Sequence, residues 1–178
     1  FALNSALSLY SQFWRLDADG DGMLSCTELA AAGSGMLSKE FLGQLLHEVP
    51  TFGGMLDFKG FLDFWLAYEN WSTPQAMRYF WRAFGVGARG VVRAASLQPL
   101  AAEILRMMGE AYLGLDAMVV LQELWDMVGC QRRNRSSDLV LELRDLLESP
   151  LGGTFLLVLV DAMAFWRYDN RESLAHKA

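Results

Sequence analysis

Twelve residues near the N-terminus, DADGDGMLSCTE (17–28), place oxygen-bearing side chains at alternate positions. Carboxylates occupy positions 1, 3, 5 and 12 of this run and a hydroxyl occupies position 9: Asp17, Asp19, Asp21, Glu28 and Ser25. A hard cation such as calcium takes about six to eight oxygen ligands at 2.3–2.6 Å, and alternate residues of a tight loop can aim their side chains at one point. Gly22 at position 6 permits the sharp turn. The spacing therefore predicts a calcium site.

The run matches the EF-hand loop pattern, D-x-[DN]-x-[DN]-G-x₅-E, at every defining position. The pattern assigns the ligands to six residues: Asp17, Asp19, Asp21, Met23 through its backbone carbonyl, Ser25 directly or through water, and Glu28 with both oxygens. Cys26 at position 10 is expected to point away from the ion. Without a cation the carboxylates would repel one another, so the empty loop is expected to be strained. The alternative is a solvated acidic turn that holds no metal.

A second motif lies in FGVGARGVVRAASL (84–97), where Gly85, Gly87 and Gly90 have the G-x-G-x-x-G spacing of a dinucleotide-binding turn. That motif functions only between a strand and a helix, and here the preceding residues 74–84 have helical period and caps. Aligned on residues 16–29, the segment keeps the turn and apolar positions but has no carboxylate. We interpret it as a degenerate calcium loop that binds neither a nucleotide nor an ion.

Apolar residues recur with helical spacing along almost the whole chain. The expected helices contain residues 6–16, 41–49, 58–66, 77–84, 97–108 and 121–128, with N-caps at Ser38, Thr73 and Asp116. Short segments of three mainly apolar residues lie between consecutive expected helices, at 23–25, 55–57, 91–93 and 139–141. Each segment occupies the position that the short strand has in a helix–loop–helix unit. We therefore expect four units in two pairs, divided near residues 71–74.

Three of the four loops are expected to be degenerate. The second keeps Gly54 and Leu56 at the turn and strand positions, but Asp57 is its only acid. The fourth carries three arginines within the polar stretch 131–137, which we interpret as a solvated insertion. The apolar segment 155–166 fits either a buried helix or a strand, because periodicity alone does not decide.

Composition narrows the function further. The chain has 178 residues, 53% of them hydrophobic, which is enough for one domain or two small ones with a real core. A net charge of −6 argues against nucleic acid or an anionic membrane as a ligand. The most apolar run, 155–160, is far shorter than the roughly 20 residues of a transmembrane segment. The surplus of aromatic and methionine side chains suggests that some apolar surface contacts a partner.

Cysteine and histidine usage argues against other chemistry. Cys26 and Cys130 form no C-x-x-C pair, which suggests a reducing compartment, and with His47 and His176 as the only histidines a zinc site is not expected. The chain carries no G-x-S-x-G, H-E-x-x-H or phosphate-loop motif, so we do not expect an enzyme. Because it begins with Phe1 rather than Met, we expect it to be part of a longer protein.

Three segments resemble the calcium-binding B″ regulatory subunits of protein phosphatase 2A, in particular the gamma-like branch that includes the plant Tonneau/Fass proteins. They are MLDFKGFLDFWLAYENWSTP (55–74), ELWDMV (123–128), and GGT (152–154) followed by VD (160–161) and FWxxDNRE (165–172). The resemblance implies a non-catalytic subunit that directs a Ser/Thr phosphatase, with the phosphatase scaffold and catalytic subunits as partners. In the Tonneau-like branch it implies a role in organising microtubule arrays, centrosomes or basal bodies.

The resemblance also implies that residues 155–166 form a helix docked on the second pair. The expected fold is therefore all-α, with two EF-hand pairs, three of the four units degenerate, and a C-terminal docked helix. The expected domains are 1–72 and 73–178, with one calcium ion bound in the first. Two alternatives are a structural component of a microtubule-based assembly, with cytoskeletal partners, and a calmodulin-like sensor. The expected location is the cytoplasm, including the cytoskeleton, centrosome, basal body or cilium.

Overall fold

The computed structural model describes residues 3–33, 35–84, 90–129, 139–171 and 174. Its elements in chain order are α1 (Leu3–Leu16), α2 (Cys26–Ala30), α3 (Lys39–Glu48), α4 (Phe58–Glu69), α5 (Pro74–Trp81), η1 (Arg82–Phe84), β1 (Val91–Arg93), α6 (Ala94–Met107), η2 (Glu110–Tyr112), α7 (Ala117–Met127), β2 (Val140–Glu142), α8 (Leu143–Glu148), α9 (Gly152–Val160) and α10 (Ala162–Asp169). The predicted helical class is confirmed. Gly85, Gly87, Arg89, Cys130, His176 and the polar stretch 131–137 lie outside the described residues.

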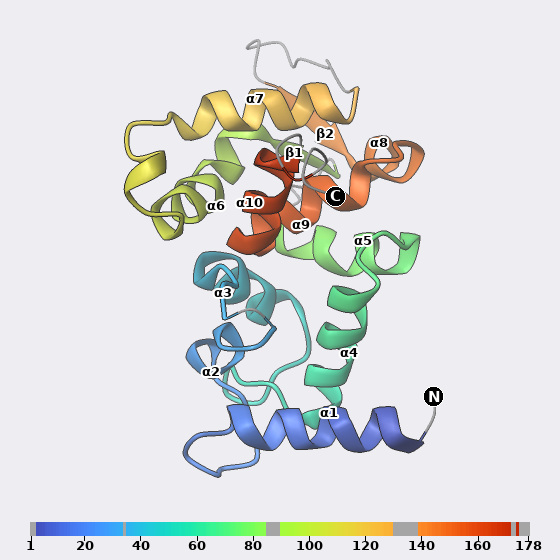
Figure 1. The fold of residues 1–178 in the computed structure, drawn as a ribbon. Coiled ribbons are helices and arrows are strands. Elements are labelled where there is room, and N and C mark those ends of the chain that lie inside the picture. The colour runs from blue at the N-terminus through green and yellow to red at the C-terminus, as the bar shows by residue number, and fades with distance from the viewer. Residues whose placement is uncertain (1–2, 34, 85–89, 130–138, 172–173, 175–178) are drawn as a thin grey trace.

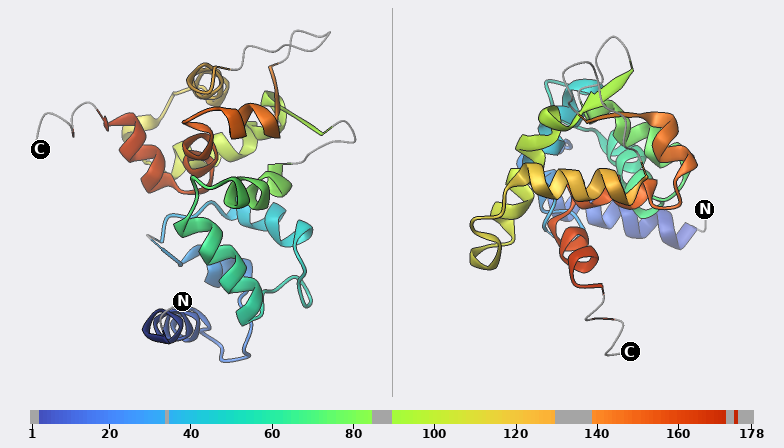
Figure 2. Two further views of the ribbon diagram at one scale, coloured as in Figure 1. Left: turned by 90° about the vertical axis from the view of Figure 1, so that its right-hand side faces the viewer. Right: turned by 90° about the horizontal axis from the view of Figure 1, so that it is seen from above.

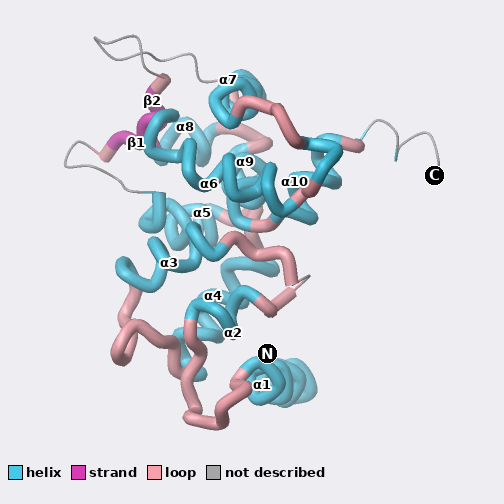
Figure 3. The backbone as a smooth tube through the Cα atoms, turned by 90° about the vertical axis from the view of Figure 1, so that its left-hand side faces the viewer, coloured by secondary structure: helices cyan, strands magenta, loops and turns pink. Residues whose placement is uncertain are grey.

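The helix–loop–helix units form two pairs, here called the first pair (α1–α4) and the second pair (α5–α8). Leu24 and Leu56 join the two loops of the first pair through an isolated antiparallel bridge. In the second pair β1 and β2 are antiparallel, with Val92 opposite Leu141 (Figure 3). These four central side chains are fully buried. The strand positions predicted from the sequence are thus confirmed, although β2 lies one residue later than the predicted step.

The predicted helix starts are also confirmed. The Ser38 hydroxyl accepts a hydrogen bond from Phe41 N, the Thr73 hydroxyl accepts one from Ala76 N, and the Asp116 carboxylate accepts one from Met118 N. Each bond satisfies an amide that the first turn of a helix leaves without an intrahelical partner. Local sequence therefore sets where these helices begin.

The two pairs are stacked end to end, with α1 at one end of the molecule and α7 at the other (Figures 1 and 2). Aromatic rings pack where the two pairs meet. The ring centroid of Phe41 in α3 lies 5.7 Å from those of both Phe80 and Phe84, and the ring centroid of Phe64 in α4 lies 6.3 Å from that of Phe80. All four rings are buried. Many of the surplus aromatic side chains thus belong to the core. The domain boundary near residue 72 stays a prediction, and it falls at the corner between α4 and α5.

The C-terminal apolar segment forms two helices, α9 and α10, divided at Asp161. It is helical, as the resemblance implied. α9 contacts α3, α5, α6 and α8, so it is covered on several sides by both pairs. Phe155 of α9 lies 5.1 Å from Trp125 of α7. A helix that is apolar on every face is stable only when it is surrounded in this way.

α9 begins where two other segments approach it very closely. A Cβ atom on Gly152 would lie 1.9 Å from the carbonyl oxygen of Leu146, and one on Gly153 would lie 2.8 Å from the carbonyl oxygen of Trp71. Only glycine allows the backbone to lie against both α8 and the corner between α4 and α5.

None of the helices within the described residues has the length and apolar character that a bilayer crossing requires.

Candidate calcium site

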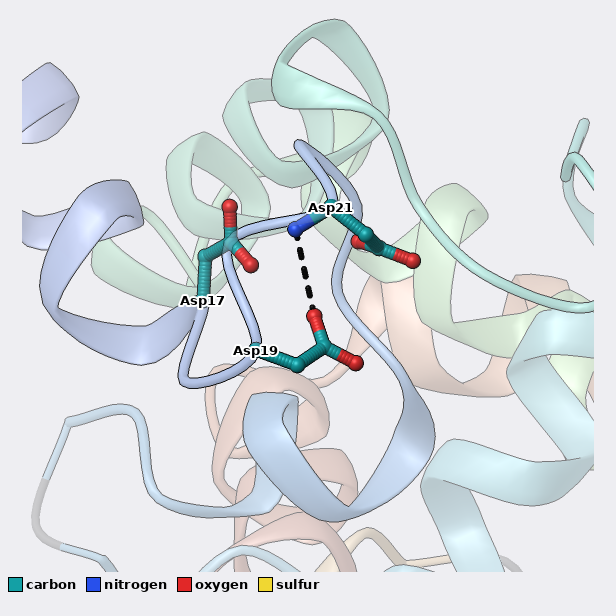
Figure 4. A group of neighbouring side chains, drawn as sticks. All are labelled: Asp17, Asp19 and Asp21. Atoms are coloured by element: carbon teal, nitrogen blue, oxygen red, sulfur yellow. Dashed lines mark hydrogen bonds between the residues drawn. The ribbon is translucent and has the colours of Figure 1, made fainter.

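The acidic loop spans the interval between the end of α1 and the start of α2. Within it, one carboxylate oxygen from each of Asp17, Asp19 and Asp21 lies within 4.8 Å of the other two (Figure 4). Asp17 is only 7% exposed, whereas Asp19 and Asp21 are exposed to solvent. The structure therefore brings together three of the predicted ligand side chains at one point of the loop.

Backbone amides of the loop hold these carboxylates in place. Asp17 accepts hydrogen bonds from Gly20 N at 2.9 Å and Gly22 N at 3.0 Å, one on each oxygen. Asp19 accepts from Asp21 N at 3.2 Å, and Asp21 accepts from Met23 N at 2.8 Å. Gly22 has φ +80°, the left-handed region that favours glycine. The loop's own N–H groups thus offset part of the repulsion among its acids.

Ser25 and Glu28 also form a capping box at the start of α2. Ser25 Oγ accepts from Glu28 N, while Glu28 Oε2 accepts from Ser25 N at 2.9 Å and from Ser25 Oγ at 2.7 Å. The Ser25 hydroxyl is the main cause that lowers the pKa of the Glu28 carboxyl below its usual range. The other oxygen, Oε1, accepts from Ala18 N at 2.9 Å and so ties the two ends of the loop together. Glu28 lies outside the cluster of three aspartates.

The donor set fits calcium. The six predicted ligands offer only oxygen atoms, which is the chemistry that calcium prefers. Asp17 is nearly buried, and no Lys or Arg in the described parts of the chain forms an ion pair with Asp17, Asp19 or Asp21. A buried carboxylate without a cation is costly. Asp17, Asp19, Asp21, Met23, Ser25 and Glu28 would hold the ion, whose two positive charges would offset half of the loop's four negative ones.

Backbone hydrogen bonds and a helix cap organise the second loop of the first pair. Phe52 and Met55 exchange two backbone hydrogen bonds of 3.0 and 3.1 Å around a turn at Gly53 and Gly54. Asp57, the only acid of this loop, accepts from Gly60 N at 2.8 Å and caps α4. Its carboxylate therefore has a helix-capping role. The absence of calcium binding here remains a prediction.

Cys26 is directed toward the next helix of the first pair. Its Sγ lies 3.6 Å from the carbonyl oxygen of Lys39, and burial raises the pKa of the thiol above its usual value. A raised pKa disfavours the reactive thiolate. The side chain is thus directed at α3, in agreement with the expectation that Cys26 points away from the ion.

The capping role of Ser25 and Glu28 was not predicted from the sequence. The signal was present, because S-x-x-E before an apolar residue is the capping-box pattern. The same two residues occupy positions 9 and 12 of the calcium loop. Ser25 and Glu28 therefore belong to both the calcium-loop pattern and the capping-box pattern, and only the calcium-loop pattern was recognised.

Paired helix–loop–helix units joined by short antiparallel bridges, with an acidic loop between α1 and α2, define an EF-hand-like fold. A solved structure labelled as a PP2A PR70 holoenzyme in a "diCa" form has the same fold, with a TM-score of 0.75. It is 21% identical and is matched over 91% of this chain and 59% of that one. No protein-family profile matches the chain.

Sequence comparison identifies relatives over nearly the whole chain. The human B″ gamma regulatory subunit of serine/threonine-protein phosphatase 2A is 33% identical over 177 residues, and the probable B″ regulatory protein TON2 of Arabidopsis thaliana is 34% identical over 182 residues. Both matches cover 98% of this chain. The chain belongs to the B″ family of phosphatase 2A regulatory subunits, as the resemblance indicated.

The chain spans 38% of the human relative and 37% of the plant one. Both relatives are named as regulatory subunits of a phosphatase, which agrees with the prediction that this chain is not an enzyme.

Proposed function

We propose that this chain is the calcium-binding part of a non-catalytic B″-type subunit of a phosphatase 2A-like Ser/Thr phosphatase. The observation that carries the proposal is the convergence of three loop carboxylates within 4.8 Å, in a chain whose relatives are B″ subunits. One ion binds in loop 17–28, and the scaffold and catalytic subunits are the partners. The net charge of −6 is unsuited to nucleic acid.

Calorimetric titration with calcium tests the site. We expect one ion to bind with a Kd of roughly 10⁻⁷–10⁻⁵ M, the range of EF-hand sensors. Glu28→Gln should weaken binding strongly, because it removes one negative charge from the donor set. Asp57→Ala is the matched control, since it removes an acid from the second loop, and it should leave the affinity unchanged. Equal binding heat and stoichiometry for the wild type and Glu28→Gln would contradict calcium binding by loop 17–28.

A pull-down tests the partners. The tagged chain is offered purified phosphatase 2A scaffold and catalytic subunits, once with calcium and once with chelator. Capture in calcium alone would support a calcium-gated subunit, and capture in both conditions would make the ion structural. Capture in neither condition would contradict the phosphatase role for this chain.

A second proposed function lies in microtubule-based assemblies. The observation that favours it is the 34% identity to the plant TON2 protein over 98% of this chain, in the branch that the sequence resembles. The chain would then contact cytoskeletal proteins at microtubule arrays, centrosomes, basal bodies or cilia in the cytoplasm. Co-sedimentation with stabilised microtubules and imaging of the tagged chain test this role. A chain that stays in the supernatant and is distributed evenly through the cell would contradict it.

A further inference from the structure

The segment between α2 and α3 joins the two halves of the molecule. Its residues 36–38, here called the strap, run antiparallel to residues 160–162 between α9 and α10, with Leu37 opposite Asp161. Ser38 N donates to the carbonyl oxygen of Val160 at 2.8 Å, and Ala162 N donates to that of Met36 at 2.9 Å. Leu37 is 1% and Asp161 3% exposed, so this bridge is buried.

Side-chain hydrogen bonds reinforce the strap from both sides. Asp161 Oδ1 accepts from Met163 N at 2.7 Å and caps α10, while Asp161 Oδ2 accepts from the hydroxyl of Tyr68 in α4. The hydroxyl of Ser38 donates to Glu103 of α6, and Glu103 Oε2 also accepts from Glu40 N at 2.9 Å. We call the strap, residues 160–162, Tyr68 and Glu103 together the junction. These polar groups favour one arrangement of the segments, because a hydrogen bond lost from a desolvated group is costly.

The junction also touches the segment that leads out of the acidic loop. α2 has only five residues and contains Glu28, and a turn at residues 31–33 follows it on the side of the strap. Within this turn Gly33 has φ +62° and lies against Tyr68: a Cβ atom on Gly33 would be 3.2 Å from the Tyr68 hydroxyl oxygen. Tyr68 therefore contacts both the segment that follows α2 and, through Asp161, the bridge to the second half.

The position of α2 decides whether Glu28 can reach the loop. Its carboxylate lies close enough to the loop's first residues to accept from Ala18 N at 2.9 Å. A displacement of α2 away from α1 would carry Glu28 out of reach. Since the turn after α2 packs on Tyr68, an intact junction keeps α2 near the other ligands.

We propose that the junction regulates the calcium site, with Tyr68 as the positioning residue: the closed junction and the calcium-bound loop stabilise each other. This coupling rests on the proposed function of loop 17–28 as a calcium site. Coupling between sites is reciprocal, so loosening the junction weakens calcium binding by the same factor by which calcium strengthens the junction. We expect that factor to be on the order of fivefold or more, within the usual range of such couplings.

Two measurements on the purified chain test the coupling. Calcium titration of Tyr68→Phe, which removes only the hydroxyl, should show affinity lower by about fivefold than the wild type. Tyr112→Phe is the matched control, because it removes a Tyr–Asp hydrogen bond of 2.7 Å to Asp169, away from the strap. It should leave calcium affinity unchanged.

Hydrogen exchange on the unaltered chain provides a readout without any substitution at the junction. Calcium should slow exchange of the Ser38 and Ala162 amides, and Glu28→Gln should abolish the slowing. Equal affinities for the wild type and Tyr68→Phe would overturn the coupling and leave the site in place, as would exchange that calcium leaves unchanged at both amides. A wild-type chain that binds no calcium would overturn both the site and the coupling.

Discussion

Loops 17–28 and 49–60 of the first pair share a backbone plan and differ in the side chains placed on it. In each, a fully buried leucine at position 8 forms the bridge, Leu24 to Leu56, with N···O distances of 2.7 and 2.9 Å. In each, position 9 is an N-cap, Ser25 or Asp57. The carboxylates at positions 1, 3, 5 and 12 occur only in the first loop. Positions 8 and 9 are structural in both loops, whereas only the first loop has the acids that the calcium-loop pattern requires.

The largest expected effect is a loss of stability on truncation of the two buried leucines that form the bridge between the loops. Leu24→Ala and Leu56→Ala should each lower the free energy of unfolding by about 2–5 kcal/mol, because each leaves a cavity at a fully buried site. Urea denaturation in chelator measures both. If only one of the two substitutions were costly, the loops would not share a scaffold.

The next largest effect is on calcium affinity, and it distinguishes an acid of the first loop from the acid of the second loop. Asp17→Asn should weaken calcium binding by roughly 10- to 100-fold, since affinity depends on the charge of the ligands. Asp57→Asn makes the same change in the second loop and leaves a good N-cap, so both calcium affinity and stability should stay close to the wild type. Titration calorimetry of the two variants measures the contrast. Equal losses of affinity would contradict it.

Adding the missing acid should not create a second site. Gly60 holds position 12 of the second loop, and a Cβ atom there would lie 2.9 Å from Leu56 Cδ2. Gly60→Glu should therefore lower stability by about 1–2 kcal/mol through crowding of the core. Calcium stoichiometry should remain one, because positions 1, 3 and 5 offer no carboxylate. Two bound ions would show that position 12 alone decides binding.

The smallest effect concerns the caps. Ser25→Ala should cost about 1 kcal/mol, as should Asp57→Ala, through loss of the N-cap. Ser25→Ala also removes the main cause of the lowered pKa of Glu28. A lowered folded-state pKa stabilises the protein above the ordinary glutamate pKa of about 4.3, and this contribution is lost as the pH falls below it.

The gap in stability between the wild type and Ser25→Ala should therefore narrow as the pH falls from 6 to about 3. Asp57→Ala leaves the Ser25–Glu28 pair in place and serves as the control. Unfolding curves in chelator across this pH range test the difference. A gap that stays constant with pH would show that the Ser25 hydroxyl does not set the ionisation of Glu28.

Features with local causes were predictable from the sequence. Ser38, Thr73 and Asp116 mark helix starts because their side chains bond to amides two or three residues later. The convergence of Asp17, Asp19 and Asp21 follows from their spacing in one tight loop. The break between α9 and α10 was not predicted. Asp161 is a local N-cap signal for α10 that was overlooked, whereas its pairing with Leu37 across the molecule has no local signal.

The bridge between Leu37 and Asp161 also has a consequence for folding order. Its partners are far apart in the sequence, and contacts of such long sequence separation form slowly, since the loop-closure entropy is lost first. During synthesis the first pair emerges long before residues 160–162. Until then the two hydrogen bonds of this bridge cannot form. The first pair is therefore completed by helices that leave the ribosome much later, and a nascent chain arrested before them would lack the bridge to residues 160–162.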